Sequence, residues 1–376
     1  MNIEQLNSEQ LKAVNHIDGP MLVLAGAGSG KTKVLTNRIA RLIEEGVSPS
    51  NILAITFTNK AAKEMKDRIT RLVGVTAYNI QISTFHSLGL KILKENYSLL
   101  GYDKNFTIID SDDVLTIIKK IMKELNLSKD YYNPREIKNK ISSAKNAIMS
   151  VEDFSKVEFD HKVVEVYKIY TKKLRQGNSV DFDDLLILPI KLFKTYPNVL
   201  DEYQDRYKYI LIDEYQDTNE AQYTFSKILA SKYRNIFVVG DNDQAIYAFR
   251  GANYKNILNF EKDYPEAKSV VLEENYRSTK TILNAANDVI KNNKERKSKN
   301  LWSNKPVGDK ITYKLVGTEK EEASFVADEI KSLLEQGVKE EDIAVLYRTN
   351  AQSRVVEEYM LKKNIKYRVV GSFYFY

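Results

Sequence analysis

Short apolar runs rich in β-branched residues alternate along this chain with longer segments of helical periodicity. We predict six of these runs as strands: Met21–Ala25, Ile52–Phe57, Ile80–Thr84, Tyr209–Asp213, Ile236–Gly240 and Val270–Glu273. Because the runs are apolar at successive positions, both faces of their sheet must be covered, as in parallel sheets whose strands are joined by helices. The sequence therefore predicts an α/β fold built on a buried parallel sheet.

Two further regions depart from this pattern. Residues 105–178 are rich in Lys, Asn and Glu at helical spacing, for example in Val114–Leu127 and Val163–Leu174, and strands resume afterwards. We interpret this region as a helical insertion. Closer to the C-terminus a second βαβαβ series is predicted, with strands at 310–316, 342–347 and 366–370 and helices at 319–335 and 352–363.

This order gives the expected domains: a first α/β domain at 1–104 and 179–280, the insertion at 105–178, and part of a second α/β domain at 281–376. The chain ends in four aromatic residues, Phe373 to Tyr376, where polar residues are usual. We expect that this end either docks firmly or continues into a longer protein. The second domain is accordingly expected to be truncated.

Composition and charge exclude several kinds of site. The chain has no cysteine and three histidines, which excludes disulfides, cysteine-ligated metals and thiol catalysis and disfavours a histidine-built metal site. The net charge is +6, of which +5 (8 basic against 3 acidic residues) lies in 280–310, and we interpret the basic stretch 291–299 as a solvated helix end or linker. No apolar run approaches the roughly 18 residues of a membrane span, and a secretion signal is not evident, so a cytoplasmic location is expected.

The strongest chemical signal is the segment Ala25-Gly26-Ala27-Gly28-Ser29-Gly30-Lys31-Thr32, between a predicted strand and an amphipathic helix. Its spacing fits the phosphate-binding loop G-x-x-x-x-G-K-[ST], with Ala25 in place of the first glycine. Glycines let backbone N–H groups and the helix N-terminus face phosphates. Lys31 would reach the β- and γ-phosphates and the Thr32 hydroxyl would ligate Mg²⁺, so the loop predicts binding of a nucleoside triphosphate.

A pair of carboxylates, Asp213 and Glu214, ends one of the predicted strands. On a strand that neighbours the phosphate loop, Asp213 could hold Mg²⁺ and Glu214 could polarise an attacking water. Since a switch that only binds nucleotide would not need the second carboxylate, the pair favours hydrolysis.

Seven segments, in order along the chain, resemble motifs of the UvrD/Rep/PcrA family of superfamily 1 DNA helicases. They are 6–10, 25–32, 56–62, 83–87, 213–217, 240–247 and 274–278, and Leu346–Arg354 is similar to the start of the family's second motor domain. The resemblance implies a RecA-like P-loop NTPase sheet with a helical insertion, a second RecA-like domain, and ATP and Mg²⁺ as cofactors. Ala245 stands where these helicases commonly have serine, which is a mild departure.

The resemblance also implies roles around the nucleotide. Gln10 would read the adenine base, Tyr276 would stack on it, and Arg277 would contact the γ-phosphate. Gln244 would sense the γ-phosphate from the strand next to the phosphate loop and link the nucleotide state to DNA. The expected catalytic set is Lys31, Asp213, Glu214, Gln244 and Arg277, and the expected metal ligands are Thr32 and Asp213.

For single-stranded DNA the resemblance points to a set of aromatic and polar side chains: Phe57, Asn59, Thr84, Phe85, His86, Tyr247, Phe249 and Arg250. Aromatic rings can stack on bases, while hydroxyl, amide and guanidinium groups hold phosphates. Phe57 and Phe85 each follow a predicted strand and could instead belong to the core. Arg250 could equally pair with a carboxylate inside the domain.

The first hypothesis is an ATP-dependent 3′-to-5′ single-stranded DNA translocase and helicase of replication or repair, with duplex–single-strand junctions as partners and a monomer as the default state. The direction of movement comes only from the resemblance. The family's later motifs, including a second arginine on the γ-phosphate, do not occur in these residues, so the chain alone is expected to hydrolyse ATP weakly or not at all. The alternative is a nucleotide-regulated DNA-binding switch or loading factor that does not unwind. A kinase for a small metabolite is disfavoured because Gln10, Gln244 and the DNA-facing aromatic residues would then have no role.

Overall fold

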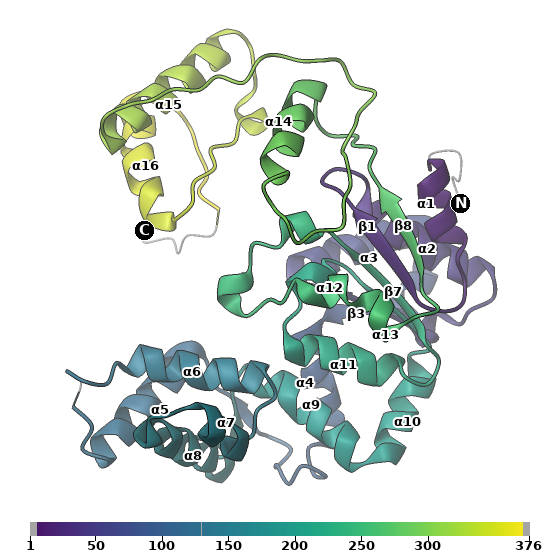
Figure 1. Ribbon diagram of the computed structural model, residues 1–376, viewed down its shortest axis with the longest axis vertical. Helices are drawn as coiled ribbons and strands as arrows, with labels where there is room; N and C mark the ends of the chain where they lie inside the picture. The colour runs from purple at the N-terminus through teal and green to yellow at the C-terminus, as the bar shows by residue number, and fades with distance from the viewer. Residues whose placement is uncertain (1–5, 129, 371–376) are drawn as a thin grey trace. The chain divides into compact units, whose positions relative to one another are not determined.

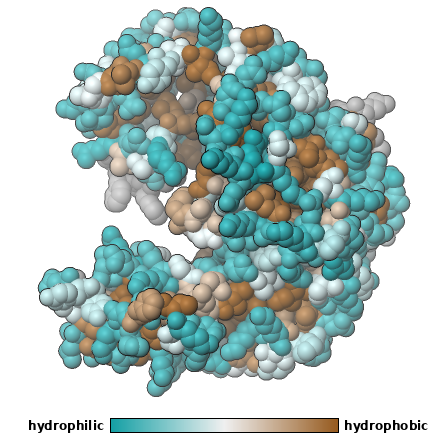
Figure 2. Space-filling model, in the orientation of Figure 1, coloured by the Kyte–Doolittle hydropathy of each residue, from teal (hydrophilic) through white to brown (hydrophobic). Residues whose placement is uncertain are grey.

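This computed structural model describes residues 6–128 and 130–370, so the four aromatic residues at the chain end lie outside the described part. By packing, the chain divides into two compact units at Gly308 and Asp309. Within the described residues, no helix is both long and apolar enough to cross a membrane. The face shown in Figure 2 is mainly hydrophilic, with scattered hydrophobic patches.

The first unit is organised by a six-stranded sheet (Figure 1). Its strands are β1 (Met21–Ala25), β2 (Ile52–Thr56), β3 (Gln81–Thr84), β6 (Tyr209–Ile212), β7 (Asn235–Gly240) and β8 (Lys268–Leu272). They pair in the order β3-β2-β6-β7-β1-β8, and every pairing is parallel. All six predicted strands and the parallel α/β architecture are therefore confirmed.

Successive side chains of the four inner strands, β1, β2, β6 and β7, enter two different cores, which explains why these strands are apolar at nearly every position. On β1, Met21 and Val23 belong to one core, whereas Leu22 and Leu24 belong to the other. The first core is covered by α1 (Ser8–Asn15), α2 (Lys31–Glu44) and α3 (Asn59–Val73). The second is covered by α4 (Phe85–Asn96), α9 (Asp184–Thr195), α10 (Pro197–Arg206), α11 (Glu220–Ala230), α12 (Lys255–Leu258) and α13 (Phe260–Asp263).

The inserted region forms a helical bundle with a hydrophobic core of its own (Figure 1). Its helices are α5 (Ser111–Glu124), α6 (Pro134–Asn146), α7 (Val151–Val157) and α8 (His161–Gln176). Local sequence sets their starts: the Asp110 side chain caps α5 by accepting hydrogen bonds from two backbone N–H groups, and α6 begins with proline after the capping Asn133. A short parallel pair, β4 (Thr107–Ile108) with β5 (Ser179–Val180), brings the two ends of the insertion together.

Residues after β8 continue to pack on the first unit. Helix α14 (Lys280–Ile290) is held to the following segment by hydrogen bonds from Asn287 Nδ2 to the Leu301 carbonyl (2.8 Å) and from the Thr281 N–H to the Val307 carbonyl (3.0 Å). The packing boundary thus lies near residue 308, whereas the sequence pattern places the second domain from residue 281.

In the second unit the two predicted helices form, as α15 (Glu319–Glu335) and α16 (Ser353–Lys362). The three predicted strands do not: within 309–370, residues 310–316, 342–347 and 366–370 pair in no ladder. A strand exists only where another strand accepts and donates its backbone hydrogen bonds, whereas a helix satisfies its own. Apolar side chains at these positions accordingly stay exposed, including Leu315, Leu346 and Val370.

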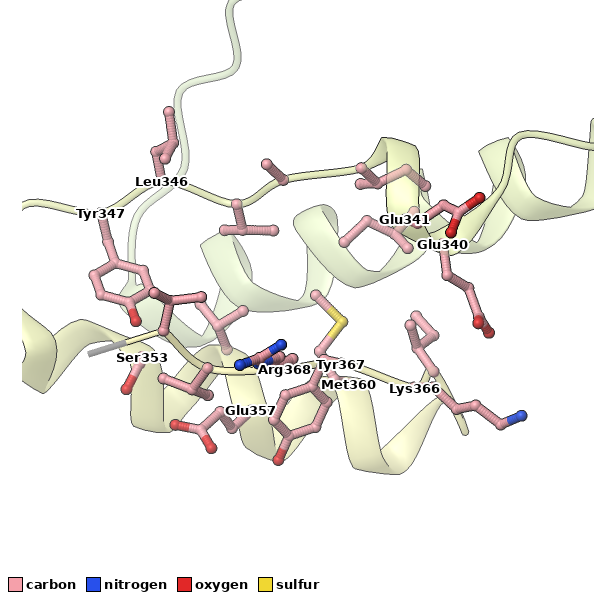
Figure 3. A pocket seen from close by; sticks show the side chains of 18 of the residues that line it. Glu340, Glu341, Leu346, Tyr347, Ser353, Glu357, Met360, Lys366, Tyr367 and Arg368 are labelled. Carbon is pink, nitrogen blue, oxygen red and sulfur yellow. The ribbon is translucent and has the colours of Figure 1, made fainter. Parts of the chain in front are cut away.

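A cavity of about 610 Å³ lies between α15, α16 and the unpaired segments of the second unit (Figure 3). Met360 lines it from α16, and Tyr347 and Tyr367 line it from the extended segments. This unit has a small hydrophobic core around Ala327, Ile330 and Met360.

Candidate nucleotide and DNA site

The predicted functional residues gather at one edge of the sheet. In a parallel sheet all strands end at the same edge, and ligands of open α/β sheets bind there. The phosphate loop follows β1, Asp213 and Glu214 follow β6, Gln244 follows β7, and the segment 274–278 follows β8. The residues expected to contact DNA follow β2, β3 and β7.

The phosphate loop has the backbone that its glycines predict. Gly28 (φ 66°) and Gly30 (φ 90°) adopt positive φ, and α2 begins directly afterwards at Lys31. A Cβ on Gly28 would lie 2.5 Å from Asn275 Nδ2. Ala25 departs from the glycine of the usual pattern without strain, because it is the last residue of β1 and pairs in the ladder with Leu272.

Lys31 joins the phosphate loop to the acidic strand end. Its Nζ lies 2.8 Å from Glu214 Oε2 and 3.4 Å from Gln244 Oε1, and its side chain is largely buried. A phosphate placed at the N-terminus of α2 would compete with Glu214 for this ammonium group. Thr32 follows as the second residue of the helix, at the same end.

The paired carboxylates lie in a strained and electrostatically crowded turn. Glu214 takes a left-handed backbone conformation (φ 50°), which non-glycine residues adopt rarely and which is often found at functional sites. Burial and then the charge of Glu214 raise the pKa of Asp213 to about 6. The same two causes raise the pKa of Asp217 to about 6. A cation bound here would relieve this repulsion.

The sequence led us to expect the acidic strand directly beside the phosphate-loop strand, but the two strands are not neighbours. β7 pairs with both β1 and β6 and separates them. Gln244, which follows β7, is therefore the residue that comes from the adjacent strand, as predicted. Strand order depends on pairing between distant segments and is not encoded in local pattern.

The residues at this edge fit Mg²⁺ held together with a nucleotide. Within the described ranges, no group of three or more His, Cys, Asp or Glu side chains is arranged to hold a metal by itself. Mg²⁺ commonly takes one or two protein oxygens and completes its shell with phosphates and water. The Thr32 hydroxyl and the Asp213 carboxylate are oxygens of this kind, and their role as ligands stays a prediction. Asp217 has a buried Oδ1 without a hydrogen-bond partner.

Gln10, the expected adenine reader, is fully buried and holds helix α1 to the phosphate loop. Its Nε2 donates to the Ser29 carbonyl (2.9 Å) and its Oε1 accepts from the Asn7 N–H (3.1 Å). Each amide atom has capacity for one further hydrogen bond, so contact with a base edge stays a prediction.

Tyr276 and Arg277 lie beside the phosphate loop, and both are exposed. The Tyr276 backbone N–H donates to the Gly28 carbonyl (3.0 Å), and its hydroxyl donates to Glu274 Oε2 (2.7 Å). With these contacts, 47% of the residue is exposed. Asn275 fixes both neighbours: its Nδ2 donates to the Ala27 carbonyl (2.5 Å), and its Oδ1 accepts from the Arg277 N–H (2.8 Å). The sequence motif contained Asn275, but no role was predicted for it.

Two groups of aromatic rings lie at the ends of β2, β3 and β7. Phe57 stacks on Tyr247 with 5.5 Å between ring centroids, and Tyr247 is followed by Phe249 at 6.1 Å. His86 stacks on Phe182 at 4.1 Å. Burial lowers the pKa of His86 to about 4, so the imidazole is neutral at physiological pH and offers a ring face rather than a charge.

Phe182 is a candidate DNA contact that the sequence reasoning missed. It is 59% exposed although aromatic, and it lies directly after β5 (Ser179–Val180), where the chain leaves the insertion. A phenylalanine within a run of aspartates, Asp181-Phe182-Asp183-Asp184, was the available sequence signal. Exposure of a large ring in a loop is the kind of feature that single-strand binding uses.

Three other members of the expected DNA set have different surroundings. Phe85 is buried in the core against Phe225, so its ring is not a stacking surface and that expectation is corrected. Thr84 is also buried, and its Oγ1 accepts from the Ser87 N–H (3.2 Å) as the cap of α4. Asn59 is exposed and accepts from Ser87 Oγ (3.3 Å). The side chain of Arg250 lies outside the described part.

The basic stretch 291–299 is not simply solvated, which corrects the sequence interpretation. Lys297 and Lys291 form exposed or partly exposed pairs, but the Lys299 side chain is only 3% exposed and contacts Asp241 and Asp243. Charge pattern alone gives no sign of such burial, because buried cations depend on partners brought by other segments.

Comparison with known proteins identifies the family. The sequence model of the UvrD/REP helicase N-terminal domain matches residues 6–265, and that of the UvrD-like helicase C-terminal domain matches residues 270–376. Two similar relatives are both named ATP-dependent DNA helicase PcrA, one from Staphylococcus aureus and one from Staphylococcus epidermidis. Each is 52% identical over 378 residues, which cover 100% of this chain and 52% of the relative.

The chain spans about half the length of these curated relatives. The matched residues include the phosphate loop, the acidic strand end and the segment after β8 that together form the edge described above. This chain therefore belongs to the UvrD/REP helicase family.

Proposed function

We propose that this chain forms the ATP-driven part of a DNA helicase that moves 3′ to 5′ along single-stranded DNA. The observation that carries the proposal is the position of the loop after β7. Gln244 in this loop contacts Lys31 of the phosphate loop, and Tyr247, three residues later, stacks on the exposed Phe57. A change at the nucleotide would therefore reach the aromatic rings through one short segment.

The proposed chemistry uses side chains that already meet. The phosphates of ATP would replace Glu214 as the partner of Lys31, and Glu214 would then be free to polarise the attacking water. Thr32 and Asp213 would hold Mg²⁺, which supplies charge neutralisation at the phosphates when bound. Arg277 would add a fork of donors to the γ-phosphate.

The assay is ATP hydrolysis by the complete gene product, with and without single-stranded DNA, together with unwinding of duplexes that carry either a 3′ or a 5′ tail. We expect stimulation by DNA, unwinding only of the 3′-tailed duplex, and loss of both activities in Lys31→Ala. Lys12→Ala is the matched control, because Lys12 is exposed and, within the described part of the chain, forms its ion pair with Glu9 of the same helix.

Hydrolysis that survives Lys31→Ala, or that DNA does not stimulate, would contradict the proposal. Nucleotide-dependent DNA binding without unwinding would instead favour the alternative, a DNA-binding switch or loading factor. Unwinding only from a 5′ tail would reject the proposed direction while leaving the helicase activity intact.

The proposal includes the domain assignment: a first motor domain at 1–104 and 179–280, an insertion at 105–178, and part of a second motor domain from residue 281. The insertion has a hydrophobic core of its own, which supports its assignment as a separate subdomain. It also includes action at duplex–single-strand junctions, as a monomer, in the cytoplasm, where the proposed DNA substrate would be found.

A further inference from the structure

Two basic residues that follow α14 are buried against the loop after β7. The Lys299 ammonium group pairs with both Asp241 Oδ1 and Asp243 Oδ2. Arg296 donates from Nε to Asp243 Oδ1 (3.0 Å) and from Nη2 to Asp243 Oδ2 (2.7 Å). The side chains of all four residues are at most 12% exposed, so two cations and two carboxylates neutralise one another out of contact with most solvent.

This cluster continues to the nucleotide site through Gln244. Asp241 uses one carboxylate oxygen for Lys299, and its other oxygen, Oδ2, accepts from Gln244 Nε2 (2.6 Å). Since the amide nitrogen is thereby directed to Asp241, the amide oxygen of Gln244 faces Lys31 Nζ at 3.4 Å. The contacts thus run from Lys299 to Asp241, to Gln244 and to the phosphate loop.

Removal of Lys299 would leave Asp241 buried with its principal cation missing. A buried carboxylate without a cation either takes up a proton or draws in other donors. A protonated Asp241 could donate as well as accept, and it would no longer fix the orientation of the Gln244 amide. Lys299 thus supports the Asp241 end of the Gln244 amide, while Lys31 Nζ donates to its oxygen at the other end.

The segment that carries Lys299 also packs directly on the phosphate loop. Leu301 packs so closely on Gly26 that a Cβ there would lie 2.1 Å from Leu301 Cδ2. The Asn275 N–H, beside the loop, donates to the Trp302 carbonyl (2.7 Å). Residues 299–302 thus border the nucleotide site in two places, although the sequence motifs do not include them.

We propose that Lys299, supported by Arg296, is a positioning residue that holds Gln244 toward Lys31 through Asp241. The proposal rests on the proposed function, because it assigns Lys299 a part in ATP hydrolysis. Lys299 would not touch the nucleotide. It would act on the step that requires Gln244 at the γ-phosphate, and not on the binding of the phosphates by the loop backbone.

The test compares Lys299→Gln with Lys297→Gln in the complete gene product. Lys297 lies two residues earlier and pairs with the more exposed Glu261, so it controls for the loss of one positive charge from this stretch. We expect Lys299→Gln to lower kcat about tenfold, the effect of one misdirected hydrogen bond, with KM for ATP changed less than about threefold. Lys297→Gln should leave both constants unchanged, and the affinity for ADP, which has no γ-phosphate, should be equal in all three proteins.

A double-mutant cycle separates positioning from a general structural role. If Lys299 acts through Gln244, adding Lys299→Gln to Gln244→Ala should cause no further loss of kcat. An additional tenfold loss in the double variant, or equal kcat in Lys299→Gln and Lys297→Gln, would overturn the proposal. If Lys299→Gln does not fold, Arg296→Gln takes its place in the same cycle. The proposal is then overturned if Arg296→Gln lowers kcat as much in the Gln244→Ala background as in the unaltered protein.

The outcome also distinguishes this proposal from the one on which it rests. If the unaltered protein hydrolyses no ATP, the proposed function is wrong. If it does hydrolyse ATP and the cycle shows independent effects, only the role of Lys299 is rejected.

Discussion

Replacing Lys145 by methionine is expected to lower the free energy of unfolding by about 3–5 kcal/mol at pH 8. Lys145 lies on α6 of the insertion, and its ammonium group is 2.6 Å from Asp181 Oδ2 and 2.8 Å from Asp184 Oδ1. Only 6% of its side chain is exposed. The two aspartates lie where the chain passes from the insertion into α9, which packs on the sheet, so the cluster attaches the insertion at its base.

The magnitude follows from what the substitution leaves behind. Methionine fills nearly the same volume, but both carboxylates stay buried without their cation. Tyr170, which donates to Asp181 Oδ2 (2.7 Å), and the reciprocal backbone bonds of Asp181 and Asp184 satisfy part of their capacity but supply no charge. The expected loss is therefore that of breaking a buried ion pair, not that of removing a whole cluster.

The loss of stability in Lys145→Met should be smaller at low pH than at high pH. Burial raises the pKa of Asp184 to about 6 even with Lys145 present. For Asp181 burial also acts to raise the pKa, but the charge and hydrogen bond of Lys145, with the hydrogen bonds from Tyr170 and the Asp184 N–H, together outweigh it and lower the pKa. Without Lys145 both values rise. A folded-state pKa above the unfolded value adds stability below the unfolded pKa, and this stability is lost as pH rises through the folded pKa. The deficit of Lys145→Met should thus shrink from pH 8 to pH 5, by about 1.4 kcal/mol per pH unit for each carboxylate, over the range between its folded pKa without Lys145 and its folded pKa with Lys145.

Urea unfolding followed by circular dichroism at pH 8 and pH 5 measures the loss of stability. Hydrogen exchange of α5–α8 at the same two pH values shows whether the loss lies in the insertion. Lys173→Met is the control, since Lys173 pairs with Glu124 on the surface of the same bundle (2.9 Å, 38% and 52% exposed) and should cost less than about 1 kcal/mol. A deficit for Lys145→Met no larger than that of the control, or one that does not shrink at pH 5, would refute the reasoning.

Three further outcomes are expected. Phe182→Ala should weaken single-stranded DNA binding by about 1–3 kcal/mol in fluorescence anisotropy without changing ATP hydrolysis in the absence of DNA. Burial lowers the pKa of His86 to about 4, so its contribution to stability is present above the unfolded pKa and is lost as pH falls. In urea unfolding, the free energy of unfolding of the unaltered protein should therefore fall by about 2 kcal/mol more from pH 7 to pH 5 than that of His86→Gln. Asn275→Ala leaves the Ala27 carbonyl and the Arg277 N–H unpaired beside the phosphate loop, and should weaken binding of a fluorescent ATP analogue about tenfold.

Features that depend on local pattern could be predicted from the sequence. The phosphate loop, its flanking strand and helix, and the six strands of the sheet are short-range properties, since glycine spacing and successive apolar residues encode them directly. The helices α15 and α16 were predicted for the same reason.

Features that depend on distant segments meeting could not be predicted. Sequence pattern did not show that β7 separates β1 from β6, that Phe85 is core while Phe57 is exposed, or that three apolar runs of the second unit form no strands. Each depends on which segment lies alongside, because strand pairing and burial are non-local.

The sequence by itself determined the family, the phosphate loop and the residues that could act on a nucleotide. Tertiary structure alone decided how they are held. Lys299 looked like one more solvated cation, yet it is buried against Asp241, which also accepts a hydrogen bond from Gln244. The physical reason is that a charge is buried only when distant residues supply its partners, and no local pattern contains that information.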